Sequence, residues 1–510
     1  MKKNIFVIIF IFALLIRIGL LSQKNDLHYD EFINISAASH TEFFQKRNKY
    51  FEKNKFYTGK ELKSQLLFDG KSDMLQDLKS LRNGTGDVLH TNLYYSVFRI
   101  FFEGADGFNL NEYLIRAGLL NLILFSFSYF FMYKLLNMLF DDKKYVALGL
   151  FLAFCNSASI SNTLFLRLYQ MQEMLFILMV YLSVKYWNIT PKLSVKNLLG
   201  FSCLTAFTLL SGYYAILFVA LVYFAILIAS RSKDTINFLT LSAILSTGLV
   251  LLLYPPYFDF IVVKFINPSI MDPATISNVV ETPLWAIIIA AVNYVFFMFN
   301  HLCTALLTLY FIVIGAKLCK RKPLCAKSIW VITIICLIWG IAVLITCPHK
   351  VVRYVLPVLS LCAIFLTWIL KCYDSKKQNV FVCSIILLNL LWVSVNTFFN
   401  FGAEGFTNIK PKKAWGVKKE LTFEQDRTLP VYIAIEHNEK LVLWMTRFDD
   451  NQQYIFVSAG EKIKQKHFYL IYDGHTKPPY ALDEMKSIQL IYPYPLPTFC
   501  IEVVQKNHEV

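Results

Sequence analysis

Long apolar stretches separated by short polar breaks run through the first 400 residues of the chain. Most are roughly 17–25 residues long, the length that an α-helix needs to cross the hydrocarbon core of a bilayer. A further apolar stretch, 284–299, is expected to be re-entrant or interfacial and continuous with the helix that follows it. The pattern predicts about eleven transmembrane helices, at 4–22, 114–139, 145–163, 168–187, 197–212, 213–230, 236–254, 301–318, 328–346, 353–371 and 379–398.

Residues 22–113 form a long connection in which apolar residues recur at near-helical spacing between polar breaks. Such spacing is typical of amphipathic helices. We expect these helices to lie in the membrane interface with their apolar faces toward the membrane. The residues that set the pattern are Ile33, Ala37, Phe43, Phe44, Phe51, Leu93, Tyr94, Val97, Phe98, Phe101 and Phe102.

The last 110 residues have a different pattern, in which short β-rich runs alternate with turn residues. This pattern predicts a small α/β domain at 401–510, outside the membrane, after a transmembrane domain at 1–400. The expected strands are Val431–Ile435, Tyr454–Val457, Phe468–Tyr472, Ser487–Tyr492 and Phe499–Val504.

The composition is that of a multi-span α-helical membrane protein. Of the 510 residues, 56% are hydrophobic and 17% are charged, and the mean hydropathy is +0.48, which excludes ordinary globular domains. Lys and Arg collect on alternate loops, and such loops stay on the cytoplasmic side. No small-residue cleavage site follows Leu21, so the first helix is expected to remain as a signal anchor. The N-terminus is therefore expected in the cytoplasm, and both the 22–113 loop and the 401–510 domain outside it.

The formal net charge of +15 is expected to reflect this topology and attraction to anionic headgroups rather than nucleic-acid binding. The abundance of Lys, Asn, Phe and Ile indicates a bacterial source, and hence an inner (plasma) membrane. The sequence has no P-loop and no GxGxxG after a strand. Its 11 cysteines form no CxxC pair and no Cys/His ligand spacing. Neither nucleotide binding nor a zinc site is predicted.

Asp30 and Glu31 follow the outer end of the first predicted span and begin a polar helix. A carboxylate held there could accept a proton from an attacking hydroxyl group. The alternative is that Asp30 caps the helix that follows, a common role for Asp. Together with Asp26 and His28, the pair could also hold a divalent cation, although no cofactor is required by the sequence.

A second outward-facing element ends the long loop. Asp87 and His90 precede Tyr94 and Tyr95, which open an aromatic amphipathic helix. A His and an Asp at this position could orient an acceptor or bind a phosphate. The alternative is a polar turn followed by an aromatic belt at the membrane surface.

Basic residues on the outer side run against the usual distribution of charge, so each needs a reason. Arg116 begins the second span, and Arg167-Leu-Tyr169 begins the fourth. The guanidinium group binds phosphate through two parallel hydrogen bonds. A lipid-linked phosphate would therefore explain these residues, whereas the alternative is that they reach toward lipid headgroups.

The densest exception to the charge rule is the short outer turn between the spans at 328–346 and 353–371. It contains His349, Lys350 and Arg353, followed by Tyr354. This cluster is the strongest candidate for an anion site, and headgroup anchoring is again the alternative.

These elements resemble, in order and sidedness, the GT-C superfamily of integral membrane glycosyltransferases. The similarity is to the branch of protein O-mannosyltransferase-like and aminoarabinose-transferase-like enzymes, and it covers about residues 1–370. Thr91-Asn92 stands where the family often has paired prolines, a departure that affects the conformation of this turn. The motifs are Asp30-Glu31, His90-Thr-Asn-Leu-Tyr-Tyr95, Arg167-Leu-Tyr169, Ser211-Gly-Tyr-Tyr214 and Arg353-Tyr-Val-Leu-Pro357.

The resemblance implies a polyprenyl-phosphate sugar as donor and transfer with inversion on the outer face, to a hydroxyl-bearing glycolipid, envelope glycan or protein. It implies that Asp30 is the general base and that Glu31 orients the base or the acceptor. The expected partners are the lipid-linked sugar, membrane lipids and the acceptor, with no nucleic acid. The expected donor-phosphate residues are Arg353, Lys350, His349, Arg167 and His90. The expected pocket residues are Asp87, Tyr94, Tyr95, Tyr169, Tyr354 and Arg116.

Three other classes fit parts of the pattern. A flippase or other transporter of lipid-linked saccharides would also have many spans, but transporters usually show repeats and polar groups near the bilayer midplane. A ligase or polymerase of lipid-linked saccharides would differ in its acceptor rather than its architecture. A sensor with an outer ligand-binding domain would not need the long first loop. The rim position of the polar residues favours glycosyl transfer.

Overall fold

The computed structural model describes most of the chain, and all structural statements below concern these residues. They are 4–24, 27–39, 51–67, 73–85, 90–105, 107, 109–188, 194–259, single residues between 285 and 294, 327–346, 352–372, 378–399, 428–434, 449–458, 460–473, 480, 484–492 and 498–505.

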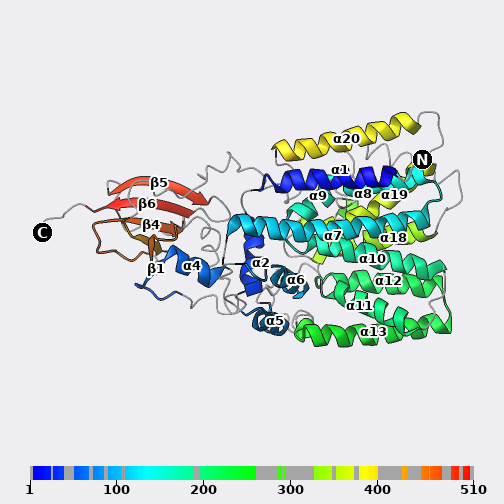
Figure 1. Cartoon of the computed structure of the whole chain (residues 1–510), viewed down its shortest axis with the longest axis horizontal. Coiled ribbons are helices and arrows are strands. Elements are labelled where there is room, and N and C mark those ends of the chain that lie inside the picture. Colours follow the sequence, from blue (N-terminus) through cyan, green and yellow to red (C-terminus); the bar gives the residue numbers. More distant parts are fainter. Residues whose placement is uncertain are drawn as a thin grey trace.

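Long apolar helices form a bundle, and the chain is a multi-span helical membrane protein (Figure 1). They coincide with ten of the predicted spans. The predicted span at 301–318 lies outside the described residues, and so does most of 284–299, so the count of eleven stays a prediction. The helices are α1 (Asn4–Leu21), α7 (Leu110–Leu139), α8 (Lys143–Phe154), α9 (Ser157–Leu164), α10 (Tyr169–Asn188), α11 (Val195–Leu209), α12 (Ala215–Ala229), α13 (Lys233–Leu253), α18 (Lys327–Thr346), α19 (Leu359–Cys372) and α20 (Gln378–Phe399).

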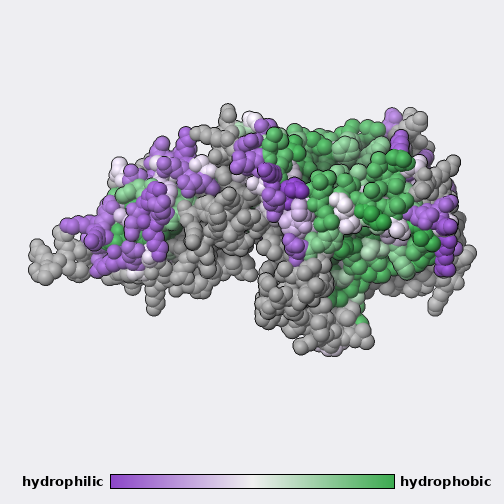
Figure 2. Space-filling model, turned by 90° about the horizontal axis from the view of Figure 1, so that it is seen from below, coloured by the Kyte–Doolittle hydropathy of each residue, from purple (hydrophilic) through white to green (hydrophobic). Residues whose placement is uncertain are grey.

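By length and composition, four of the described helices could each cross a membrane, namely α1, α7, α13 and α18. The pair α8 and α9 would make a fifth span that bends by 52°. Figure 2 shows a band of hydrophobic side chains over the bundle, with hydrophilic side chains on both sides of it. This distribution is the one expected of a bundle surrounded by lipid.

The bend between α8 and α9 has a local cause. Asn156 ends the first helix and caps the second: its side-chain NH₂ donates to the carbonyl groups of Leu152 and Ala153, and its side-chain oxygen accepts the N–H of Ser159 at 3.0 Å. Asn competes for backbone groups in this way and favours helix starts over helix interiors. After the bend, α9 runs to the end of the bundle at which Arg167 lies, two residues beyond Phe165.

Three short helices cover that end: α2 (Tyr29–Ser39), α5 (Met74–Asn83) and α6 (Leu93–Phe101). A fourth short helix, α4 (Gly59–Leu66), packs against strand β1 (Phe56–Thr58). Tyr94, Phe98 and Phe102 are buried inside the protein, where α6 packs against α2, α5 and α7. The expectation that this apolar face turns toward the membrane is therefore wrong for these residues, because neighbouring helices cover them. Phe43 and Phe44 lie outside the described residues.

A six-stranded sheet lies beyond the short helices, at the end of the molecule where the C-terminus lies (Figure 1). The five strands expected after residue 400 are all present. The order is β1-β3-β2-β4-β6-β5; β2 is parallel to both β3 and β4, and the other pairs are antiparallel. The strands are β1 (Phe56–Thr58), β2 (Val431–Ala434), β3 (Gln453–Phe456), β4 (His467–Asp473), β5 (Met485–Tyr492) and β6 (Thr498–Val504).

The strand β1 comes from the first loop rather than from the C-terminal segment. It pairs with β3 in the register Tyr57 to Tyr454, and the ring of Phe51 stacks on Phe456 with the centroids 4.4 Å apart. The first loop therefore passes through the outer sheet between α2 and α5.

Candidate active site

The beginning of α2 is fixed by reciprocal hydrogen bonds around His28. The His28 Nδ1 atom accepts the backbone N–H of Asp30 at 3.2 Å, and the Glu31 Oε2 atom accepts the N–H of His28 at 2.6 Å. These bonds occupy donors that a helix start otherwise leaves without partners. His28, rather than Asp30, is therefore the capping residue, and the Asp30 carboxylate takes no part in the cap.

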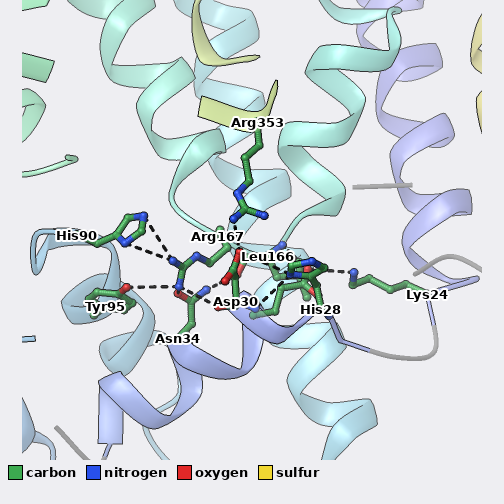
Figure 3. Close-up of polar contacts among 10 residues, drawn as sticks. Lys24, His28, Asp30, Asn34, His90, Tyr95, Leu166, Arg167 and Arg353 are labelled. Atoms are coloured by element: carbon green, nitrogen blue, oxygen red, sulfur yellow. Dashed lines mark hydrogen bonds and ion pairs between the residues drawn. The ribbon is translucent and has the colours of Figure 1, made fainter. Parts of the chain in front are cut away.

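The Asp30 carboxylate instead meets Arg353. The Oδ2 atom of Asp30 lies 2.7 Å from Nη2 of Arg353 (Figure 3). Each side chain is 14% exposed, although the Oδ2 atom itself is buried. Arg353 lies in a short 3₁₀ turn, Val352–Tyr354, before α19. Its guanidinium group lies over the rings of Phe165 and Tyr354, at 5.6 and 5.5 Å from their centroids, an arrangement that stabilises a cation. Residues from opposite ends of the bundle's sequence thus form one ion pair.

Arg167 is a buried junction behind this pair. Its Nη1 atom donates to the Asp30 carbonyl oxygen at 2.8 Å and to Asn34 Oδ1 at 2.9 Å, and lies 3.4 Å from the Tyr95 hydroxyl. Its Nη2 atom lies 3.5 Å from the ring nitrogens of His90. One guanidinium group therefore connects α2, α6 and the turn that leads to α6 (Figure 3).

Glu31 anchors the same corner from the other side. Its side chain is fully buried, and Oε1 lies 3.0 Å from Nζ of Lys24, whose side chain is 1% exposed. The same oxygen accepts the N–H of Leu166 at 2.7 Å. Together with the bond to His28, these contacts engage both carboxylate oxygens. Glu31 thus fastens the end of α1, the start of α2 and the turn before α10 to one another.

The charges around Asp30 determine its ionisation. Burial alone would raise the pKa of the Asp30 carboxyl, because burial penalises the charged form. The guanidinium groups of Arg167 and Arg353, and then the rings of His28 and His90, act in the opposite direction, and the pKa of Asp30 lies below its usual range. Asp30 is therefore ionised at neutral pH.

The remaining predicted site residues lie in different places. Tyr169 and Tyr354 lie beside Arg353, with ring centroids 6.3 Å apart. The Tyr94 hydroxyl donates to Asn121 at 3.3 Å, deeper in the bundle. Arg116 pairs with Glu112 at 2.8 Å and donates to the carbonyl groups of Glu103 and Phe101, contacts that are local to the start of α7. Predicted residues outside the described ones are Asp26, Asp87, His349 and Lys350.

Two residues of the cluster were not predicted from the sequence. Lys24 is a basic residue in the loop that is predicted to lie outside, so the reasoning that selected Arg116 and Arg167 applies to it equally. Asn34 follows Asp30 by four residues and therefore shares its face of α2. Its side chain accepts from Arg167 and donates to the Leu166 carbonyl oxygen. Spacing alone could have identified it.

A metal site can be compared with the side chains present. Within the described ranges, no group of three or more His, Cys, Asp or Glu residues is arranged to hold a metal ion. Glu31 is committed to Lys24 and two backbone amides, and Asp30 is paired with Arg353. Asp26, the fourth member of the predicted set with His28, lies outside the described residues. The divalent cation stays a prediction.

A comparison with protein families agrees with the resemblance predicted from the sequence. The model of the Alg9-like mannosyltransferase family matches residues 291–414, a stretch that includes Arg353. Among solved structures, the crystal structure of ArnT from Cupriavidus metallidurans in the apo state is similar with 12% sequence identity and a TM-score of 0.49, covering 97% of each chain. No curated protein matches the sequence. With the family match, the resemblance of this chain to the GT-C membrane glycosyltransferases is confirmed.

Proposed function

We propose that the protein is an inverting glycosyltransferase that moves a sugar from a polyprenyl-phosphate donor to a hydroxyl group of a glycolipid, envelope glycan or protein, on the outer face of a bacterial inner membrane. The observation that carries the proposal is the ion pair between Asp30 and Arg353. It joins an ionised carboxylate to a guanidinium group, which is the kind of group that binds phosphate. These are the two groups that such a transfer needs.

The reaction follows from the positions of these groups. The Asp30 carboxylate accepts the proton of the acceptor hydroxyl as the hydroxyl oxygen forms a bond to the anomeric carbon of the sugar. The bond from that carbon to the phosphate oxygen breaks, and the polyprenyl phosphate leaves with the electron pair. Its growing negative charge is stabilised by Arg353, with His349 and Lys350 assigned to the same anion. Asp30 then returns the proton to water.

The pairing of Asp30 with Arg353 also couples the donor to the base. Arg353 lowers the pKa of Asp30, which keeps the carboxylate ionised but makes it a weak base. A donor phosphate that shares the guanidinium group weakens this effect, because part of the positive charge then serves the phosphate. Asp30 therefore becomes more basic when the donor is present.

The buried residues act through Asp30. Arg167 holds the Asp30 carbonyl oxygen, and Glu31 holds the helix start through His28. The contacts of Arg167 and Glu31 are made with the protein itself. We therefore assign both side chains as positioning residues rather than as substrate-binding residues. His90 and Tyr95 support Arg167 from α6 and the turn before it.

The test is transfer of radiolabelled sugar from polyprenyl phosphate to membrane acceptors by the purified protein. Asp30→Asn should lower the rate about 10²–10⁴-fold, because it removes the base and keeps the shape. Asp142→Asn is the matched control, since Asp142 caps α8 through the N–H of Lys144 and Asn caps equally well. Its rate should equal that of the wild type.

Two results would overturn the proposal. One is transfer by Asp30→Asn at the wild-type rate. The other is movement of the intact labelled donor across a sealed vesicle without transfer to any acceptor, which is the result expected of a flippase. Transfer of a preassembled saccharide rather than a single sugar would indicate the ligase alternative.

A further inference from the structure

A second group of polar residues lies inside the bundle, below the candidate active site. We name Arg17, Ser159, Glu173 and Ser360 the buried hub. All four are at most 1% exposed. Glu173 lies four residues into α10 and Arg17 four residues before the end of α1, which is about 6 Å from each helix end at 1.5 Å per residue. Ionisable side chains at such depth are costly, so they require a role.

Glu173 joins three helices in the hub. Its Oε1 atom accepts a hydrogen bond from the Ser360 hydroxyl of α19. Its Oε2 atom accepts from Gln170 of its own helix at 2.7 Å and from Ser159 of α9 at 3.4 Å. Both carboxylate oxygens are therefore used to hold helices together.

Arg17 supplies the opposite charge. Its Nε and Nη2 atoms donate to Thr163 and Ser159 of α9, each at 2.9 Å, and Nη1 donates to the carbonyl groups of Ala13 and Phe154 at 3.0 Å. Ser159 thus stands between the guanidinium group and the carboxylate. The hub extends from α1 through α9 and α10 to α19.

The hub is connected to both halves of the ion pair above it. Tyr169 lies one helical turn before Glu173, and its ring contacts Tyr354, the neighbour of Arg353. Ser360 lies at the start of α19. A second 3₁₀ turn, Leu356–Val358, separates α19 from the turn that carries Arg353. On the other side, α9 leads directly into Arg167, which holds Asp30. The hydrogen bond from Ser360 to Glu173 therefore links α19, on the side of Arg353, to α10 and α9, on the side of Asp30. The contact between Asp30 and Arg353 links the same two sides a second time.

We propose that the buried hub positions Arg353 for the donor phosphate by fixing α19 against α9 and α10, with Glu173 and Ser360 as positioning residues. This inference rests on the proposed function. In this role Glu173 and Arg17 affect the reaction without contacting the reacting atoms. A displacement of Arg353 by about 1 Å is enough to lower the rate of transfer substantially.

The experiment measures the affinity of the detergent-solubilised protein for a radiolabelled polyprenyl phosphate, and the KM for donor and for acceptor in sugar transfer. Ser360→Ala should raise the Kd and the donor KM about tenfold and leave the acceptor KM unchanged. Ser246→Ala is the matched control, because Ser246 is a buried serine of α13 that donates within its own helix. A purely structural defect would reduce the amount of active protein and leave both constants unchanged.

A charge variant gives a second readout. Glu173→Gln leaves the Arg17 charge buried without its counter-charge, so it should weaken donor binding more than Ser360→Ala. Adding Arg17→Met should restore part of the loss, since removing both charges is better tolerated than removing one. Donor constants in Ser360→Ala equal to those of Ser246→Ala would overturn the inference. Binding without transfer by the wild type would overturn the proposed function alone, and the Kd values would still decide the role of the hub.

Discussion

The carboxylate of Asp30 is held by two different arginines in two different ways. Arg167 binds its backbone oxygen, and Arg353 binds its side chain. The first contact fixes where Asp30 lies, and both arginines lower the pKa of its carboxyl. Substitution of Arg353 therefore changes this pKa while the contact of Arg167 with the backbone oxygen remains.

Arg353→Gln should move the acidic limb of the pH profile of kcat/KM to higher pH. Arg353 lowers the pKa of Asp30, so its removal raises that pKa, and Asp30 becomes protonated at a higher pH as the solution is acidified. The measurement is kcat/KM for the donor against pH. Arg116→Gln, which changes an outer arginine paired with Glu112, should leave the limb in place. An unmoved limb in Arg353→Gln would contradict the assignment of Asp30 as the base.

At the scale of elements, the start of α2 is locked by a buried ion pair. Lys24 and Glu31 are 1% and 0% exposed, and Glu31 also binds backbone amides on two segments. Removing one member of such a pair leaves an uncompensated charge, whereas the intact pair need not stabilise strongly. The pair therefore determines which elements meet more than it adds to stability.

Lys24→Met should lower the free energy of unfolding by about 3–5 kcal/mol, because the Glu31 charge remains buried alone. Adding Glu31→Gln should recover part of this loss. The measurement is thermal unfolding of the solubilised protein at neutral pH. Lys55→Met breaks an exposed pair with Glu52, whose side chains are 53% and 74% exposed, and it should cost less than about 1 kcal/mol. Equal effects of the two lysine substitutions would rule out the anchoring role of Lys24.

The elements themselves could largely be predicted from the sequence. Helices lie at the positions of ten predicted spans, and the five predicted strands are present, because the apolar runs and the alternation that predict them are local patterns. The ion pair between Asp30 and Arg353 is a contact between distant segments, so only their common sidedness suggested it. The strand β1 has three residues, too few to show a period. The buried faces of α6 were misassigned because an apolar face does not reveal whether lipid or protein will cover it.

At the scale of the whole molecule, the first loop and the C-terminal segment share one sheet. Lys63 pairs with Asp450 at 2.8 Å, and the N–H of Gly59 donates to the carbonyl oxygen of Gln452 at 3.1 Å. A Cβ atom at position 59 would lie 2.0 Å from the carbonyl oxygen of Asp449. Only glycine permits this approach of the two backbones.

Gly59→Ala should therefore loosen β1 from β3. The clash is with backbone, which cannot turn aside as a side chain can, and overpacking of this kind costs about 1–3 kcal/mol. Hydrogen exchange of the β3 amides should be faster than in the wild type, while exchange in α10 is unchanged. Gly200→Ala adds a Cβ that meets nothing within 4 Å, and it should leave β3 exchange as it was. Unchanged β3 exchange in Gly59→Ala would mean that the pairing with β1 does not protect that strand.

Because β1 belongs to the sheet, the C-terminal segment alone does not contain the complete sheet. Cutting the chain near residue 400 would expose the edge of β3 in the C-terminal piece. In the N-terminal piece, Phe56–Thr58 would lose the strand with which it pairs. An unpaired edge is a template for association with other chains. An exchange of the outer sheet between related enzymes must therefore carry two separate stretches of sequence, 51–66 and the C-terminal segment, as a single transplant.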